Sequence, residues 1–266
     1  MAQYVGVKGV ARAVKKQYVG VAGISRNVKK GYIGVDGVAR SFVSSGTQAG
    51  EFAVGTTIYL TFNSKKTAFK VVHQGNPNAS LYDASCNGTW LMMSNAYGSN
   101  AWDSGNNDYA NSDIHALLNG TVWNKFSAEA KAAIKQVKIP YWKGTGTSGS
   151  LTTGANGLST KVFLLSLREV GIVSTSSYIP EDGVKLSYFP ATDAASSKRV
   201  VKYSSTARKW FTRTPTKQEV DSVYHIATDG ALASGVWNVT TSVYFCPAVI
   251  LDSSTLFDSD DKTMIV

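Results

Sequence analysis

The chain has 266 residues, which fits one large domain with an appended segment or two small domains. Its 43% hydrophobic and 17% charged residues allow a buried core and argue against a disordered chain, and no apolar run approaches the roughly 18 residues of a membrane span. The net charge is +9, but residues 1–40 hold eight basic residues and one acidic residue, so the basic character does not indicate that the main domain binds nucleic acid.

A nine-residue phrase occurs three times at the start of the chain. Residues 4–12 read YVGVKGVAR, and the phrase recurs as YVGVAGISR at 18–26 and YIGVDGVAR at 32–40, with equivalent positions 14 residues apart. Each copy places a dipeptide ending in glycine, such as residues 8–9, between short apolar runs, which is the pattern of a two-residue β-hairpin turn. We expect three hairpin repeats over residues 1–40.

Hairpins this small are marginally stable alone, so they need one another or a larger surface to pack on. A flexible basic tail is the alternative, but a tail needs no strict period. We interpret residues 1–40 as a segment for attachment or oligomerisation and expect a homo-oligomer. The candidate attachment residues are the repeated tyrosines and arginines Tyr4, Arg12, Tyr18, Arg26, Tyr32 and Arg40. Ser41–Gly50 is small and polar, which predicts a linker.

From residue 51 to 266, short apolar runs alternate with turn residues, which predicts a strand-rich α+β domain. Gly144–Gly157 has one large side chain, Leu151, and is expected to be a surface loop. The predicted strands are Thr57–Thr61, Phe69–His73, Val137–Pro140, Val162–Leu165, Trp210–Pro215, Ser222–Ala227, Gly235–Val239 and Ala248–Leu251.

Two or three short helices are predicted among these strands. Asn111–Gly120 has Ser112 as a plausible N-cap and Gly120 as its end, and Ser127–Gln136 begins at a capping serine. The sequence Ser166-Leu167-Arg168-Glu169 matches a capping box for a further short helix, which explains Ser166 without a role as nucleophile.

Catalytic and metal chemistry is not indicated. Cys86 and Cys246 are interpreted as two buried thiols in a protein folded in a reducing compartment. The three histidines form no ligand-spaced cluster with them, so we expect no metal and no cofactor. Asp182–Gly183 is expected to be a turn rather than half of a carboxylate pair. The acidic stretch at residues 258–261 either binds calcium weakly or is a solvated tail.

Five blocks along the chain carry a resemblance to a known family: DASCNGTWL (83–91), NDYANSDIHALLN (107–119), KIPYWKG (138–144), GANGLSTKVFLLSLRE (154–169) and WFTRTP (210–215). Over roughly residues 50–252 the chain resembles a domain of undescribed function common in phages and prophages of gut Firmicutes. The repeats also resemble an N-terminal element of phage virion proteins from the same hosts. The resemblance implies a C-type-lectin-like fold related to formylglycine-generating enzymes. The chain departs from the pattern at Thr212, Phe245 and Cys246, where leucine, valine and arginine are usual.

In some relatives, retroelements diversify the stretch that corresponds to Thr216–Tyr244, which implies an exposed ligand-binding face here. Tyr224, Trp237 and Tyr244 would be its anchors, although Trp237 and Tyr244 as core residues are the alternative. For His225, a surface or packed position is the alternative to a binding role. The full set of candidate ligand-binding residues is Lys217, Gln218, Glu219, Tyr224, His225, Trp237, Asn238 and Tyr244. Asn95–Asn111 also has the composition of a binding loop, but Asn107–Ser112 belongs to the family pattern, which suggests a structural role.

These expectations describe a phage virion protein that is not an enzyme. Residues 1–40 would bind other virion proteins, and the domain of residues 51–266 would present a lectin-like surface to a host-surface or mucosal ligand. The absence of a secretory signal fits assembly in the bacterial host cytoplasm. A capsid or tail decoration protein without a specific ligand is the alternative. A glycan-cleaving enzyme would need paired carboxylates roughly 5–10 Å apart, and the sequence indicates no such pair.

Overall fold

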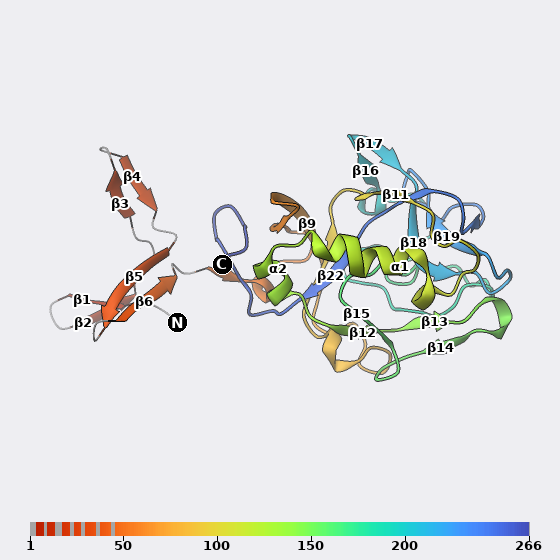
Figure 1. Ribbon diagram of the computed structural model, residues 1–266, viewed down its shortest axis with the longest axis horizontal. Coiled ribbons are helices and arrows are strands. Elements are labelled where there is room, and N and C mark those ends of the chain that lie inside the picture. The colour runs from red at the N-terminus through yellow and green to blue at the C-terminus, as the bar shows by residue number, and fades with distance from the viewer. Residues whose placement is uncertain are drawn as a thin grey trace.

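The computed structural model describes residues 4–7, 10–13, 18–21, 24–27, 30–35 and 38–43 as backbone strands, and residues 46–265 in full. The first six strands form three antiparallel pairs (Figure 1). These pairs are β1 (Tyr4–Val7) with β2 (Val10–Ala13), β3 (Tyr18–Val21) with β4 (Ile24–Asn27), and β5 (Lys30–Val35) with β6 (Val38–Val43). Val7 pairs with Val10 and Gly6 with Ala11. The expected turns at residues 8–9, 22–23 and 36–37 lie outside the described residues.

The folded domain begins ahead of the expected boundary at residue 51. Strand β7 (Thr47–Gln48) pairs with β23 (Leu256–Phe257), and the 3-10 helix η1 (Ala49–Glu51) follows it. Ala49 is fully buried, and a Cβ on Gly50 would lie 2.9 Å from the Cβ of Ser253. The small residues expected to form a linker therefore let the chain pack closely against the C-terminal strand.

Two sheets form the centre of the domain. The first has the order β22 (Ala248–Leu251), β10 (Thr89–Met93), β9 (Lys65–Gln74) and β8 (Thr57–Phe62), all antiparallel. The second has the order β11 (Gly98–Asn100), β21 (Val243–Phe245), β18 (Trp210–Pro215), β19 (Ser222–Ile226) and β20 (Trp237–Asn238), in which only the β18–β21 pair is parallel. Each of these strands except β11 and β21 overlaps a segment that the apolar pattern predicted or a family block marked.

Both faces of the first sheet are buried, because alternate side chains enter two separate apolar clusters. On β10, Leu91 and Met93 join one cluster, whereas Trp90 and Met92 join the other. The first cluster also contains the apolar side chains of the helix that follows Ser112, namely Ile114, Leu118 and Val122. The family-pattern tryptophan Trp90 is fully buried and donates its indole N–H to the carbonyls of Gly75 and Cys86 at 3.0 Å.

The helices are short and begin where their caps predict. The Oγ of Ser112 accepts from the N–H of His115 at 3.3 Å, and the Oγ of Ser127 accepts from Ala130 at 3.2 Å. The predicted end at Gly120 is wrong, because the helix continues through a π-helical turn whose side chains at Leu118 and Val122 are in the core. The helical elements are η2 (Ala84–Cys86), η3 (Tyr109–Asn111), α1 (Asp113–Leu117), η4 (Leu118–Val122), α2 (Ala128–Ala133), η5 (Gly146–Ser148) and η6 (Ser197–Arg199).

Three short strand pairs complete the domain: β12 (Val137–Ile139) with β15 (Leu158–Thr160), β13 (Tyr141–Lys143) with β14 (Ser150–Thr152), and β16 (Val201–Tyr203) with β17 (Thr206–Arg208). The expected loop Gly144–Gly157 thus contains β14 and η5. Val162–Leu165 is buried as expected, but it forms a single bridge, from Phe163 to Ala248, instead of a strand. The domain is strand-rich with few short helices, as an α+β domain is. Among the described residues no helix combines the length and apolar character needed to cross a bilayer.

Candidate functional site

The segment Thr216–Tyr244, expected to carry the ligand-binding residues, begins with a tight loop between β18 and β19. One buried side chain holds this loop. The amide nitrogen of Asn107 donates to the carbonyls of Thr216, Glu219 and Ser222 at 3.0, 2.8 and 2.8 Å, and the backbone N–H of Asn107 donates to Val220 at 2.8 Å. Because Asn107 is fully buried, the backbone of the loop is fixed from inside the domain.

At the tip of this loop the side chains lie toward solvent. Gln218, Glu219 and Val220 are exposed, Val220 by 56%. Lys217 is half-buried, with its Nζ 5.3 Å from the ring centre of Trp142. Beside the loop, Tyr178 is 44% exposed and its carbonyl accepts from the N–H of Lys217. Asn238 is exposed and donates to Asp221 at 2.9 Å. We define the 217–220 surface as Lys217, Gln218, Glu219 and Val220 together with Tyr178 and Asn238.

Two expected contact residues are buried instead of exposed. Tyr224 is 9% and His225 2% exposed, because β19 lies inside the second sheet with both faces covered. Burial raises the pKa of the Tyr224 phenol, against hydrogen bonds with Thr216 and Ser176 that lower it. Burial, with a smaller contribution from Lys209, lowers the pKa of His225 to about 4. These two side chains cannot make the ligand contacts expected of them.

Trp237 and Tyr244 are half-buried and serve as packing residues. The ring of Trp237 lies 4.5 Å from that of His225, and Lys209 Nζ lies 4.6 Å from its centre. Tyr244 contacts Tyr203 at a centroid distance of 5.1 Å. Each ring therefore packs on the core with one face, which is closer to the alternative that Trp237 and Tyr244 are core residues than to a role as ligand anchors.

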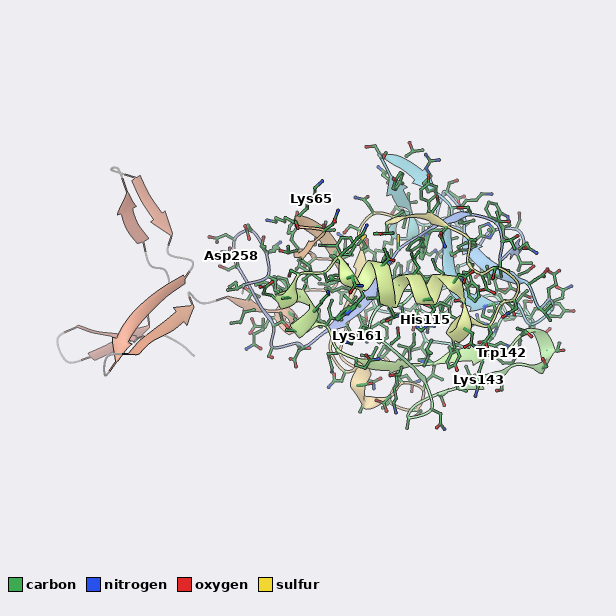
Figure 2. All side chains as sticks on the ribbon, in the orientation of Figure 1. Lys65, His115, Trp142, Lys143, Lys161 and Asp258 are labelled. Carbon is green, nitrogen blue, oxygen red and sulfur yellow. The ribbon has the colours of Figure 1, made fainter. Side chains whose placement is uncertain are left out.

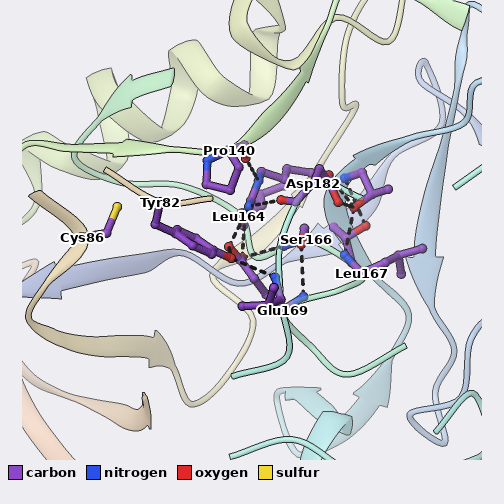
Figure 3. A network of polar contacts seen from close by, with 12 residues as sticks. Tyr82, Cys86, Pro140, Leu164, Ser166, Leu167, Glu169 and Asp182 are labelled. Carbon is purple, nitrogen blue, oxygen red and sulfur yellow. Dashed lines mark hydrogen bonds and ion pairs between the residues drawn. The ribbon is translucent and has the colours of Figure 1, made fainter. Parts of the chain in front are cut away.

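Beneath the loop lies a buried ionic network (Figure 3). The guanidinium of Arg213 donates to both carboxylate oxygens of Glu169, at 2.5 and 2.7 Å, and also to the carbonyls of Pro140, Leu164 and Asp182. Burial alone would lower the pKa of Arg213, but the charge and hydrogen bonds of Glu169 outweigh it and raise that pKa. All five guanidinium donors point at oxygen atoms, so the buried charge is satisfied.

The same network contains Tyr82, Ser166 and Asp182. The phenol of Tyr82 donates to Glu169 at 2.8 Å, and the Oγ of Ser166 accepts from the N–H of Glu169 at 3.1 Å. The carboxylate of Asp182 accepts from Thr214 at 2.9 Å, and burial raises its pKa to about 6. The Ser166 N–H donates back to Glu169 at 2.9 Å, so both bonds of the capping box are present, but the expected short helix is wrong because residues 167–171 form a turn. All of these side chains are closed off from solvent, which suits a structural role.

The remaining chemical candidates are also accounted for. Cys86 and Cys246 are free and buried, as expected, and burial raises the pKa of the Cys86 thiol to about 12. Within the part of the chain that the structure describes, no group of three His, Cys, Asp or Glu side chains could hold a metal ion.

In the acidic stretch at residues 258–261, Asp258 accepts from the N–H groups of Asp260 and Asp261, and Asp261 pairs with Lys66 at 3.3 Å. This stretch is therefore an ordered turn rather than a free tail.

Comparison with known families adds one finding. A family model described as Domain of unknown function (DUF6273) matches residues 87–253, more than half of the chain. This chain belongs to the DUF6273 family. Comparisons with curated proteins and with solved structures find no match.

The DUF6273 match includes Asn107, the Glu169–Arg213 pair and the whole 217–220 surface. It leaves out β9, which pairs with β10, and β8, which pairs with β9 at the edge of the first sheet. The folded unit of this chain is therefore larger than its DUF6273 match.

The sequence did not reveal that Glu169 and Arg213 are partners in the buried ionic network. Glu169 was placed only in the capping box with Ser166, and Arg213 received no role. The signal was Arg213 itself, a charged residue in the middle of the apolar strand WFTRTP, because such a charge needs a buried partner of opposite sign.

Proposed function

We propose that this protein is a phage virion adhesion protein. Residues 1–40 attach it to other virion proteins, and its DUF6273 domain presents the 217–220 surface to a ligand on the host surface. The domain acts by binding and not by catalysis, and it has a C-type-lectin-like fold. The resemblance of the sequence blocks and repeats supports the phage origin and the fold.

The observation that carries the binding role is the way in which Asn107 holds the loop. Three carbonyls of the loop bind one buried amide, so the loop keeps its shape without help from its exposed side chains. Side chains on such a loop can change without unfolding the domain, which is what a recognition surface on a rigid scaffold requires. The exposed tip combines a lysine, a glutamine, a glutamate and a valine, which offers both signs of charge and apolar contact.

The three hairpins support attachment by the N-terminal segment. Their strand pairs keep one register, with Val7 opposite Val10 and Val21 opposite Ile24. Repeated units of one shape suit a repeated or symmetric docking surface, and several copies on one particle would raise the avidity for a weak ligand.

The test separates attachment from adhesion. Full-length protein and a chain that starts at Gly46 are each mixed with phage particles, and the particles are purified. We expect only the full-length chain to copurify, and equal incorporation of both would overturn attachment by the repeats. Adhesion is measured as binding of labelled full-length protein to host cells. A Gln218→Ala, Glu219→Ala variant should bind less, while a Lys143→Met variant, altered at an exposed residue outside the 217–220 surface, should bind normally.

A decoration protein without a ligand is the second candidate. The exposure of Val220 and Tyr178 favours it, because a neighbouring subunit would remove both from water. Protection of these two residues from surface labelling on intact particles would support decoration, whereas their accessibility would support adhesion.

A further inference from the structure

Two surface cavities lie on either side of Ala68, on the β8–β9 side of the domain and apart from the 217–220 surface. One, of about 380 Å³, is lined by Thr57, Lys70, Ser94, Tyr188 and Lys198 together with apolar side chains. The other, of about 450 Å³, is lined by Asn63, Lys65, Asn95, Tyr97 and Lys125 together with apolar side chains. Ala68 lines both of them.

The two cavities repeat one arrangement. Each has two lysines, and in each a lysine lies against a tyrosine ring: Lys198 Nζ is 5.2 Å from the centre of Tyr188, and Lys125 Nζ is 5.0 Å from the centre of Tyr97. Neither lining contains an aspartate or a glutamate. Among the described residues, none of these lysines forms an ion pair with a carboxylate. Both cavities therefore hold positive charge that their own walls do not neutralise.

The smaller cavity also has unused hydrogen-bonding capacity. Lys70 donates one bond, to Thr57 Oγ1 at 2.6 Å, which leaves two of its three N–H groups free. The Oγ of Ser94 is buried and has no partner among the described residues. A buried hydroxyl without a partner is costly, and rotation of the Ser94 side chain toward the cavity would let a ligand oxygen satisfy it.

We propose that the two cavities bind successive units of an acidic oligosaccharide whose sugars carry carboxylates. The lysines take the carboxylates, the free hydroxyls and amides take sugar oxygens, and the tyrosine rings with Met92, Met93 and Val201 take the apolar faces of the sugar rings. Two adjacent cavities with the same chemistry suit a polymer with a repeated charge. A nucleic acid fits less well, because residues 41–266 hold nearly equal numbers of basic and acidic residues.

The site is tested by calorimetry on the full-length protein. The probe is tetragalacturonate, and the same tetramer with its carboxylates methyl-esterified is the neutral control. Tetragalacturonate should bind and its ester should not. Lys70→Met, Lys198→Met and Lys125→Met should each weaken binding by about ten- to a hundredfold, as expected when one charged hydrogen bond is lost.

Lys143→Met is the matched control, since it removes the same charge from an exposed residue that lies toward the other end of the domain from Lys65 (Figure 2). It should change binding less than twofold, and thermal unfolding should show that all four variants are folded. Absence of binding at millimolar tetragalacturonate, equal binding of the ester, an equal effect of Lys143→Met, or tighter binding of a six-residue oligothymidylate would each overturn the proposal. A Gln218→Ala, Glu219→Ala variant should still bind the sugar, so this result stands apart from the adhesion test.

Discussion

Arg213 and Glu169 face each other in the interior of the domain as a two-bonded ion pair, with both side chains fully removed from solvent. They come from β18 and from the turn after Val162–Leu165, 44 residues apart in the chain. The pair therefore joins the second sheet to the irregular segment that packs on it. Desolvation of two charges is costly, and only the complete set of hydrogen bonds around them offsets that cost.

Removal of one partner of this pair should destabilise the domain strongly. Glu169→Gln leaves the guanidinium of Arg213 buried without a negative charge, and we expect a loss of about 3–5 kcal/mol in the free energy of unfolding. Arg213→Met should cost a similar amount. In urea unfolding, the double variant should lose much less than the sum of the two single losses.

Tyr82→Phe is the control for this pair, because it removes one hydrogen bond to Glu169 and keeps the ion pair. It should cost about 1–3 kcal/mol. Additive losses in the Glu169–Arg213 double variant would show that the two side chains do not act as a pair.

Asp182 should make stability depend on pH between about 4 and about 6. Its folded pKa of about 6 lies above the ordinary value of 3.8, so the folded state binds the proton more readily than the unfolded state in this interval. The free energy of unfolding that Asp182 contributes is present below pH 4 and falls as the pH rises through 6. Relative to Asp182→Asn, wild type should lose about 1–3 kcal/mol over this range. A constant difference between the two proteins in urea titrations at pH 4 and pH 7 would contradict this.

His225 should have the opposite pH dependence. Its folded pKa of about 4 lies below the ordinary 6.5, so its contribution to stability is present above pH 6.5 and is lost as the pH falls toward 4. His225→Phe keeps a ring against Trp237 and removes the buried Nδ1, which has no partner. The variant should therefore be more stable than wild type, and its advantage in thermal unfolding should be larger at pH 5 than at pH 7. An unchanged difference would show that His225 stays uncharged in both states.

Asn107→Ala should loosen the loop that carries the 217–220 surface. The change removes three hydrogen bonds to the loop carbonyls, and we expect a loss of about 2–4 kcal/mol. Amide hydrogen exchange within residues 216–222 should accelerate more than exchange elsewhere. Gln218→Ala should stay within about 0.5 kcal/mol of wild type, because its side chain is exposed. If Asn107→Ala and Gln218→Ala changed stability and hydrogen exchange equally, the idea that Asn107 alone fixes the backbone of the loop would be contradicted.

Local patterns predicted the elements of this domain well. Ser112 and Ser127 begin their helices, and β8, β9, β18, β19 and β22 lie where apolar and β-branched runs predicted them, because these signals act over a few residues. Gly120 failed as a helix end because Leu118 and Val122 are buried on either side of it, and burial outweighs the preference of one glycine.

Long-range relationships were not predictable in the same way. The burial of Tyr224 and His225 depends on which strands flank β19, and alternation along one strand does not reveal that both of its faces are covered. Asn107 was placed correctly as structural, although its partners lie more than 100 residues away and became known only from the fold. The lysine–tyrosine cavities left no sequence signal, because their linings come from five separate segments.

The pairing of β7 with β23 determines how the domain carries mechanical load. A pull on the hairpin segment enters the domain at Thr47, and the bonds that it reaches first are those of this two-residue ladder and of Ala49 to Thr255. The ladder is two residues long, shorter than β9 or β10, so we expect it to open before the two central sheets do. If residues 1–40 anchor the protein as proposed, tension would therefore open the β7–β23 pair and leave the loop of residues 216–221 folded.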